Sequence, residues 1–204
     1  VLYMVNKKTL GEIEIDYISS LKIPENKPAK QIFFCPVGLV GAGKTTITKP
    51  IAERMGLLRL SSDELRKILK ENGHDYSPVK DMGFKIAKDF AHKGFSIAFD
   101  LDCSNIDSKN FIEDLAADLK AEIIWVHIKT PESHIFEKFR KHPPTWLADN
   151  PQMMIDNYNS QKEKRARENT HFDFFMTFDT SKDDVSGQIE EGIKRIQYFL
   201  KSLD

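Results

Sequence analysis

The stretch "CPVGLVGAGKTT", residues 35–46, decides the fold. Its residues at positions 38, 43, 44 and 45 satisfy the pattern G-x-x-x-x-G-K-[ST]. The apolar run "QIFFCPV", residues 31–37, predicts a buried strand, and residues 45–55 predict a helix that Gly56 ends. Glycines between a strand and a helix let backbone N–H groups face inward around an anion, beside the positive end of the helix dipole. The stretch therefore predicts a loop that wraps phosphate groups.

Two side chains of this loop have separate expected roles. Lys44 is expected to reach the outer phosphates of a nucleotide, and the Thr45 hydroxyl is expected to hold Mg²⁺. An acid at the end of a neighbouring strand usually supports that metal. Asp100 and Asp102 both end the strand that "FSIAFDLD" predicts; we prefer Asp100, and Asp102 stays open. The expected nucleotide contacts are Gly38, Gly41, Ala42, Gly43, Lys44, Thr45 and Thr46.

Apolar strands and helical segments alternate along the rest of the chain. The predicted strands cover residues 31–37, 57–61, 95–102, 122–128 and 172–178. Such alternation is typical of a parallel sheet covered by helices on both faces, with ligands beyond the carboxyl ends of the strands. We therefore predict an α/β fold, a three-layer sandwich around a five-stranded parallel sheet. Pro50 lies inside the first predicted helix, where proline removes a backbone donor, so we expect a kink or an irregularity there.

Residues 1–30 have a different character from the rest of the chain. Ile13, Ile15 and Tyr17 alternate with acidic residues, which predicts a short strand. Pro24 and Pro28 then flank a polar linker. We predict an N-terminal appendage and linker over residues 1–30 and one phosphate-loop domain over residues 31–204.

Composition excludes several classes of protein. The 204 residues are 40% hydrophobic, and their net charge of −1 does not suggest broad, salt-driven binding to nucleic acid, although a local basic patch stays open. The two cysteines, Cys35 and Cys103, provide no disulfide framework and are interpreted as small core residues. We expect a cytoplasmic protein with no membrane contact, no zinc site and no obligatory protein partner.

The phosphate loop alone does not separate a switch, a motor and a kinase. A GTPase needs a guanine-reading N/T-K-x-D, which "SKDD" at residues 181–184 only approximates, and the D-x-x-G at residues 184–187 comes too late in the chain. Larger motor ATPases carry extra domains for which this chain has no room. A small kinase that uses ATP is the class that remains.

Five motifs support this class by their order. They are "GLVGAGKTT", "LSSDELRKIL", "GFSIAFDLDCSN", "WVHIKTPESHIFEKFR" and "FDTS", within about residues 31–200. In this order they resemble the small P-loop kinases, an AAA-type ATPase-like family that includes polynucleotide 5′-hydroxyl kinases, chloramphenicol phosphotransferase and zeta toxins. The resemblance implies an ATP- and Mg²⁺-dependent phosphotransferase that moves the γ-phosphate to a hydroxyl.

The resemblance also implies residues on the acceptor side. In polynucleotide-kinase-like members, the aspartate of a D-x-x-R element takes the proton of the attacking hydroxyl, and its arginine steadies the acceptor. The matching residues are Asp63 and Arg66, which follow the second predicted strand one helical turn apart. The alternative is that Asp63 only favours the N-terminus of its helix, with Arg66 as a surface partner.

An arginine-bearing lid over ATP is a further implication, at about residues 136–168. Arg140 stands where a lid arginine is expected, and Arg165 and Arg167 are candidates for a second one; the alternative for "KEKRAR" is a solvated helix face. Trp146 in the lid loop is either a substrate contact or an anchor of the loop. By analogy with related kinases, residues 179–181 border the adenine.

The predicted catalytic residues are Lys44, Asp63, Arg66 and Arg140. The acceptor is the hydroxyl of a small molecule or of a nucleic-acid end, and the sequence does not decide between them. One alternative is an ATP-binding P-loop regulator without transferase activity. Another is a nucleic-acid end-processing protein, which needs a basic groove leading to Asp63.

Overall fold

A computed structural model of the chain describes residues 7–141 and 150–203. Its core is one five-stranded sheet in which every pairing is parallel, with the order β2-β3-β1-β4-β5. The strands are β1 (Ile32–Val37), β2 (Leu58–Ser61), β3 (Ile97–Asp100), β4 (Glu122–Lys129) and β5 (Met176–Asp179). The predicted α/β fold with a five-stranded parallel sheet is therefore confirmed.

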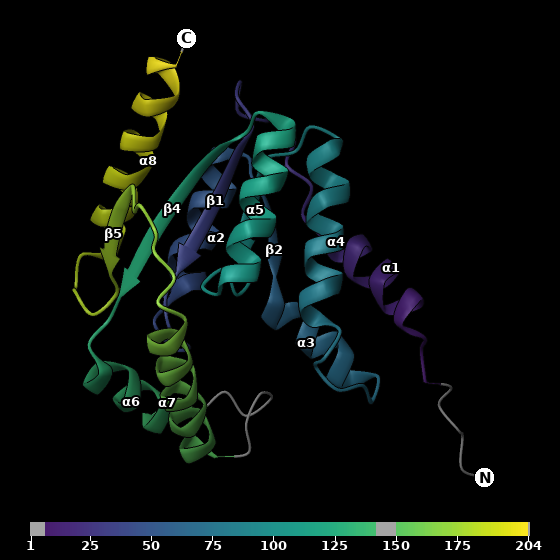
Figure 1. Cartoon of the computed structure of the whole chain (residues 1–204), viewed down its shortest axis with the longest axis vertical. Coiled ribbons are helices and arrows are strands. Elements are labelled where there is room, and N and C mark those ends of the chain that lie inside the picture. Colours follow the sequence, from purple (N-terminus) through teal and green to yellow (C-terminus); the bar gives the residue numbers. More distant parts are fainter. Residues whose placement is uncertain (1–6, 142–149, 204) are drawn as a thin grey trace.

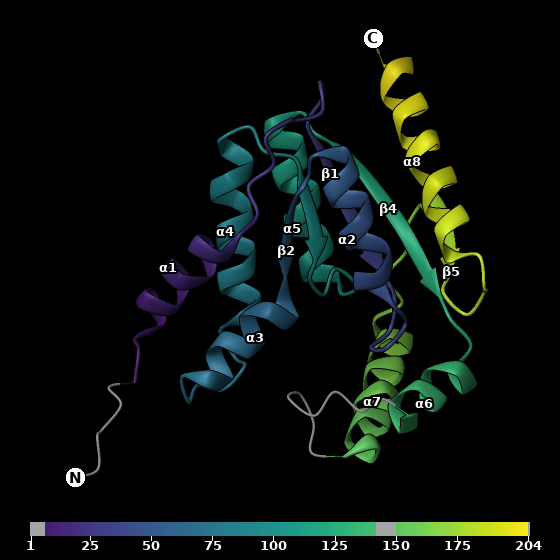
Figure 2. The same ribbon diagram turned by 180° about the vertical axis from the view of Figure 1, so that it is seen from behind.

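Helices cover both faces of the sheet (Figures 1 and 2). They are α1 (Leu10–Ser20), α2 (Lys44–Met55), α3 (Ser62–Glu71), α4 (Val79–His92), α5 (Ile106–Leu119), α6 (Glu132–Lys141), α7 (Pro151–Glu168) and α8 (Val185–Ser202). One face carries α4 and α5, the opposite face carries α2 and α8, and α6 and α7 lie beyond the carboxyl ends of the strands. Within the described ranges, no helix has both the length and the apolar character needed to span a bilayer.

β1 is the centre of the fold because it pairs with both β3 and β4, and all six of its residues are buried. Its side chains alternate between two hydrophobic cores. Phe33 and Cys35 belong to the core beneath α4 and α5, whereas Ile32 and Phe34 belong to the core beneath α2 and α8. Burial on both faces explains why the strand reads as a continuous apolar run.

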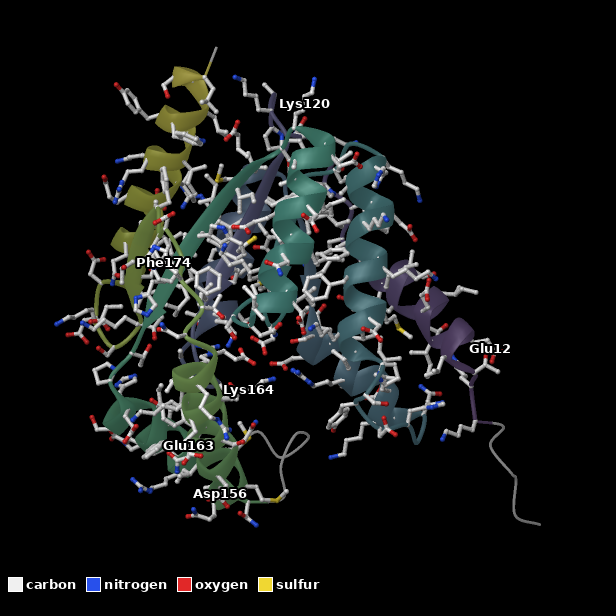
Figure 3. All side chains as sticks on the ribbon, in the orientation of Figure 1. Glu12, Lys120, Asp156, Glu163, Lys164 and Phe174 are labelled. Carbon is white, nitrogen blue, oxygen red and sulfur yellow. The ribbon has the colours of Figure 1, made fainter. Side chains whose placement is uncertain are left out.

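The strand predicted around residues 13–17 is wrong, because these residues form helix α1. Thr9 caps the helix: its hydroxyl accepts a hydrogen bond from the Glu12 amide at 3.3 Å, and the Glu12 carboxylate accepts one from the Thr9 amide at 2.8 Å. Figure 3 shows Glu12 at the outer end of α1. Ile13 and Tyr17, four residues apart, are buried, whereas Ile15 is 64% exposed. Apolar residues at this spacing fit a helix face as well as an alternating strand.

Tyr17 ties α1 to the end of β2. Its hydroxyl accepts a hydrogen bond from the Ser61 amide at 2.7 Å and donates one to the Ser61 carbonyl at 3.2 Å. Ser61 is also the residue that caps α3, through a bond from the Glu64 amide to the Ser61 hydroxyl. Burial raises the pKa of Tyr17 and so keeps this phenol protonated. The domain boundary at residue 30 stays a prediction, but α1 packs into the same core as β2.

Two other elements differ from their predictions. α2 runs without interruption from Lys44 to Met55, so the irregularity expected at Pro50 is absent from this helix. Because Pro50 has no N–H, the Thr46 carbonyl lacks its helical hydrogen bond. Thr46 is an exposed residue of the first turn. The last strand begins only at Met176, although the Phe175 amide just before it already donates to the Trp125 carbonyl of β4 at 2.8 Å. There the Phe174 ring stacks on His127 with a centroid separation of 5.0 Å (Figure 3).

The helical assignment of α1 predicts unequal effects of two isoleucine substitutions. Ile13→Ala removes a fully buried side chain and should lower the free energy of unfolding by about 2–5 kcal/mol. Ile15→Ala, in the same helix, removes an exposed side chain and should change it by less than about 0.5 kcal/mol. Denaturant unfolding of both variants measures the difference. Equal losses would indicate that both side chains face the core, as a strand requires.

Candidate active site

The loop of residues 38–43 connects β1 to α2 at the carboxyl edge of the sheet. Gly41 and Gly43 have φ values of 79° and 91°, which side chains other than glycine adopt only with strain. Space is restricted as well. A β-carbon on Gly41 would lie 2.5 Å from the Phe139 ring, and one on Gly43 would lie 2.9 Å from the Thr180 side chain. The loop therefore needs glycine at both positions, for conformation and for packing.

Two threonine hydroxyls hold the Ala42 carbonyl. Thr130 follows β4 and Thr180 follows β5, and their hydroxyls donate to this oxygen at 2.8 and 2.7 Å. The two hydroxyls also lie 2.7 Å from each other. The sequence analysis missed both residues as supports of the loop, although a threonine directly after each of two neighbouring strands was a readable signal. These contacts fasten the loop to β4 and β5.

Lys44 begins α2 and folds back over the loop. Its ammonium donates to the carbonyls of Gly38 and Leu39, at 2.9 and 3.1 Å. Burial lowers the pKa of Lys44 and the nearby charge of Arg165 lowers it further, while three carboxylates act in the opposite direction. These carboxylates belong to Asp102, Asp100 and Asp63. The predicted base Asp63 therefore lies within electrostatic reach of the loop lysine.

The two strand-end acids have different partners. Asp100 is buried, and its Oδ1 accepts a hydrogen bond from the Thr45 hydroxyl at 3.1 Å. Burial raises the pKa of Asp100, opposed by its bonds to Thr45 and Arg59. Asp102 lies after the end of β3, and its carboxylate accepts bonds from the Ser104 amide and hydroxyl. Only Asp100 therefore contacts the hydroxyl that is expected to hold the metal.

Thr45 and Asp100 suit Mg²⁺ chemically. A hydroxyl and a carboxylate supply hard oxygen ligands, and Mg²⁺ commonly takes one or two such groups besides water and substrate phosphates. Within residues 7–141 and 150–203, no group of three or more His, Cys, Asp or Glu side chains is arranged to hold a metal. A metal at this position would thus depend on phosphate oxygens as further ligands.

Arg59 is a residue of the site that the sequence analysis missed. It lies on β2, and its Nη1 donates to Asp100 Oδ2 at 2.7 Å. Its Nη2 bonds to the Glu64 carboxylate on α3. The signal was visible in "LLRLS", where a charged residue interrupts an otherwise apolar strand. A largely buried arginine in such a position requires acidic partners, which the sequence did not identify.

Helix α7 reaches the phosphate loop with two side chains. Gln161 accepts a hydrogen bond from the Val40 amide at 3.2 Å, and Arg165 donates to the Gly38 carbonyl at 2.7 Å. Of the predicted lid arginines, Arg165 faces the loop, whereas Arg140 and Arg167 are exposed. The sequence analysis missed Gln161, and Trp146 lies outside the described residues.

The predicted acceptor-side pair is in direct contact. Arg66 Nη1 donates to Asp63 Oδ1 at 2.8 Å and to the Ser62 hydroxyl at 3.1 Å. The Asp63 side chain is half exposed and so accessible to an incoming molecule. The contact fits both the catalytic reading and the alternative of a surface ion pair on α3.

Other singled-out residues lie in the core. Cys35 and Cys103 are buried and carry free thiols, and burial raises the pKa of the Cys35 thiol. Trp125 is buried on β4 and packs edge-on against Phe172 at 4.9 Å between ring centroids. The interpretation of the two cysteines as small core residues agrees with these positions.

Comparison with known proteins places this geometry in a family. The AAA domain family matches residues 34–145, more than half of the chain. The matched range contains the phosphate loop, Asp63, Asp100 and Arg140. No curated protein matches the chain.

Solved structures with a similar fold include several kinases. The APS kinase of Mycobacterium tuberculosis, in complex with AMPPNP and APS, is 15% identical; the alignment covers 83% of this chain and 99% of that one, with a TM-score of 0.54. The shikimate kinase of Acinetobacter baumannii, in complex with shikimate, is 18% identical, with coverages of 85% and 95% and a TM-score of 0.50. A chain of the PezAT toxin–antitoxin system of Streptococcus pneumoniae is 16% identical, with coverages of 95% and 98% and a TM-score of 0.52. At these identities the likeness shows a P-loop kinase-like fold.

The packing of the loop predicts different effects for two glycine substitutions of similar backbone geometry. Gly41→Ala places a methyl group against Phe139 and should deform the loop, which lowers nucleotide affinity at least about tenfold. Gly94→Ala, at φ 78° against 79° for Gly41, meets no atom within 4 Å. It should cost about 1–2 kcal/mol of stability and leave nucleotide binding unchanged. Calorimetric titration and thermal melting of both variants check this. Identical nucleotide affinities would contradict the role given to Gly41.

Proposed function

Because the chain belongs to the AAA domain family, we propose that it is an ATP- and Mg²⁺-dependent phosphotransferase that moves the γ-phosphate to a hydroxyl. The observation that carries this proposal is the convergence of charge around the phosphate loop. Thr45 of the loop donates to the strand-end acid Asp100 at 3.1 Å, and the acceptor-side acid Asp63 lies in the first turn of α3, directly after β2, at the same carboxyl edge of the sheet. A protein that only bound nucleotide would need the first of these acids but not the second.

Nucleotide binding on this proposal uses groups that are already in place. The amides of the loop and the N-terminus of α2 would surround the phosphates, with Lys44 on the outer ones. Thr45 and Asp100 would hold Mg²⁺, which neutralises charge on the β- and γ-phosphates. Arg165 shares the Gly38 carbonyl with Lys44 and would add a second positive charge beside the migrating group. Arg140 stays a candidate for a lid arginine.

Transfer then needs a base for the acceptor. The acceptor oxygen attacks the γ-phosphorus while its proton passes to an oxygen of Asp63, and the bond to the bridging oxygen breaks to release ADP. Arg66 orients the Asp63 carboxylate through their 2.8 Å hydrogen bond and can also steady the acceptor. A carboxylate that is half exposed is accessible to such an acceptor.

The nucleotide is proposed by name, whereas the acceptor is proposed only as a chemical class. ATP is preferred over GTP because no guanine-reading element stands at the required place in the sequence, and residues 179–181 are proposed to border the adenine. Thr180 in that segment touches the loop at Ala42. The acceptor is proposed to be the hydroxyl of a small molecule or of a nucleic-acid end, in the cytoplasm.

The proposed base gives a direct prediction. Asp63→Asn keeps the shape of the side chain but removes the proton acceptor. Phosphate transfer should fall by about 10²–10⁴-fold, the usual effect of losing a positioned general base, while ATP affinity stays near the wild-type value. Transfer of labelled γ-phosphate and calorimetric ATP binding, measured on one preparation, test both parts.

Asp81→Asn is a matched control, because Asp81 is an exposed acid in the first turn of α4, as Asp63 is in that of α3. It should lose only the small stabilising effect of a negative charge at a helix N-terminus. If Asp63→Asn behaves like this control, with full transfer and slightly lower melting temperature, Asp63 is not the base. If the wild-type protein binds ATP but transfers phosphate to no acceptor, the regulator alternative is supported.

A further inference from the structure

We propose that Arg59 is a positioning residue for Asp100 and that it links this carboxylate to α3, the helix of the acceptor side. The inference rests on the proposed function, since it assigns Asp100 to support of the metal. It adds a residue outside the phosphate loop, the D-x-x-R element and the lid. Its evidence is a chain of contacts from Thr45 through Asp100 and Arg59 to Glu64.

Arg59 and Thr45 together orient the Asp100 carboxylate. β2 and β3 are parallel with Ser61 opposite Asp100, so Arg59 starts two residues below Asp100 and extends toward the carboxyl edge. Its Nη1 donates to Asp100 Oδ2 at 2.7 Å, while the Thr45 hydroxyl donates to Oδ1 at 3.1 Å. Each oxygen thus has its own donor, and the plane of the carboxylate is fixed.

Arg59 and Asp100 form an ion pair that is largely shielded from water. The Asp100 side chain is 4% exposed and the Arg59 side chain is 16% exposed, so solvent screens this pair little. A buried carboxylate without a partner is strongly unfavourable. The planar guanidinium compensates the charge and sets the direction of the bond, which a lysine ammonium does less well. Arg59 therefore compensates the charge of Asp100 and holds the carboxylate beside Thr45.

Arg59 also contacts α3, the helix that carries the proposed base. Arg59 Nη2 bonds to Glu64, which is the direct neighbour of Asp63 in the first turn of α3. One guanidinium therefore connects the strand-end acid of β3 with the helix that carries the proposed base. Arg59 and Glu64 also line a hollow of about 550 Å³ between α2, α3 and residues 20–24. This hollow gives small molecules access to the place that the Arg59 side chain occupies.

The access allows a chemical rescue experiment. In Arg59→Ala, the Mg²⁺ concentration that gives half-maximal binding of a non-hydrolysable ATP analogue should rise at least about tenfold, the scale of one lost charge-assisted hydrogen bond. Nucleotide binding without metal should stay unchanged. Millimolar methylguanidinium should restore the low Mg²⁺ requirement, because from the hollow it can enter the space left by the Arg59 guanidinium and pair with Asp100 there. Urea, which is planar and neutral, should not.

Two further variants complete the test, one that retains the charge at position 59 and one that removes an arginine elsewhere. Arg59→Lys retains the charge and should give an Mg²⁺ requirement between those of the wild type and Arg59→Ala; it carries the test if the alanine variant does not fold. Arg54→Ala removes an exposed arginine of α2 that pairs with Glu190, and it should leave the Mg²⁺ requirement unchanged.

The outcomes separate this inference from the proposed function. A wild-type protein that binds no nucleotide with Mg²⁺ would contradict the proposed function itself. If wild-type binding depends on Mg²⁺ and both Arg59 variants match it, only the role of Arg59 is overturned. A raised requirement in Arg59→Ala that urea relieves as well as methylguanidinium, or that neither relieves, would also overturn it.

Discussion

The close contact between the glycine loop and the residues packed around it is the constraint on which the rest of the site depends. At Gly41 and Gly43 the backbone has positive φ and leaves no room for a β-carbon. The neighbours are Phe139 of α6 on one side and Thr180, directly after β5, on the other. Because the loop is fixed from both sides, Lys44 and the start of α2 have a defined position. The loop thus joins the sheet, helix α6 and helix α2.

Charge around this loop is balanced in a way that suits an incoming polyphosphate. Lys44 and Arg165 converge on the Gly38 carbonyl, where their charges repel each other. Asp102 partly offsets them: its carboxylate lies 3.9 Å from Arg165. Although burial acts to raise the pKa of Asp102, its bonds to Ser104 and the charge of Lys44 hold that pKa below its usual value. Both cations donate to a neutral backbone carbonyl. A charged phosphate oxygen would be a stronger acceptor for them than this carbonyl.

Local sequence signals predicted much of this molecule, and their limits are physical. The loop motif and the apolar strands are short-range features, and the structure has them in the predicted order. α1 was misread because Ile13 and Tyr17 satisfy both a two-residue and a four-residue period. Gln161 lies 121 residues from its partner Val40, a separation at which no pattern in the sequence pairs them. The choice of Asp100 over Asp102 depended on where β3 ends, which periodicity does not determine to one residue.

The central claim is that the loop around Lys44 is the place where a γ-phosphate is bound and transferred. The most direct measurement follows labelled γ-phosphate from ATP to a panel of hydroxyl acceptors that includes oligonucleotide ends, nucleosides, nucleotide sugars and antibiotic-like alcohols. The wild-type protein and Lys44→Ala are compared in the same assay, with thermal melting to show that the variant is folded. We expect label on at least one acceptor with the wild-type protein and none with the variant. Equal transfer by the two proteins would contradict it.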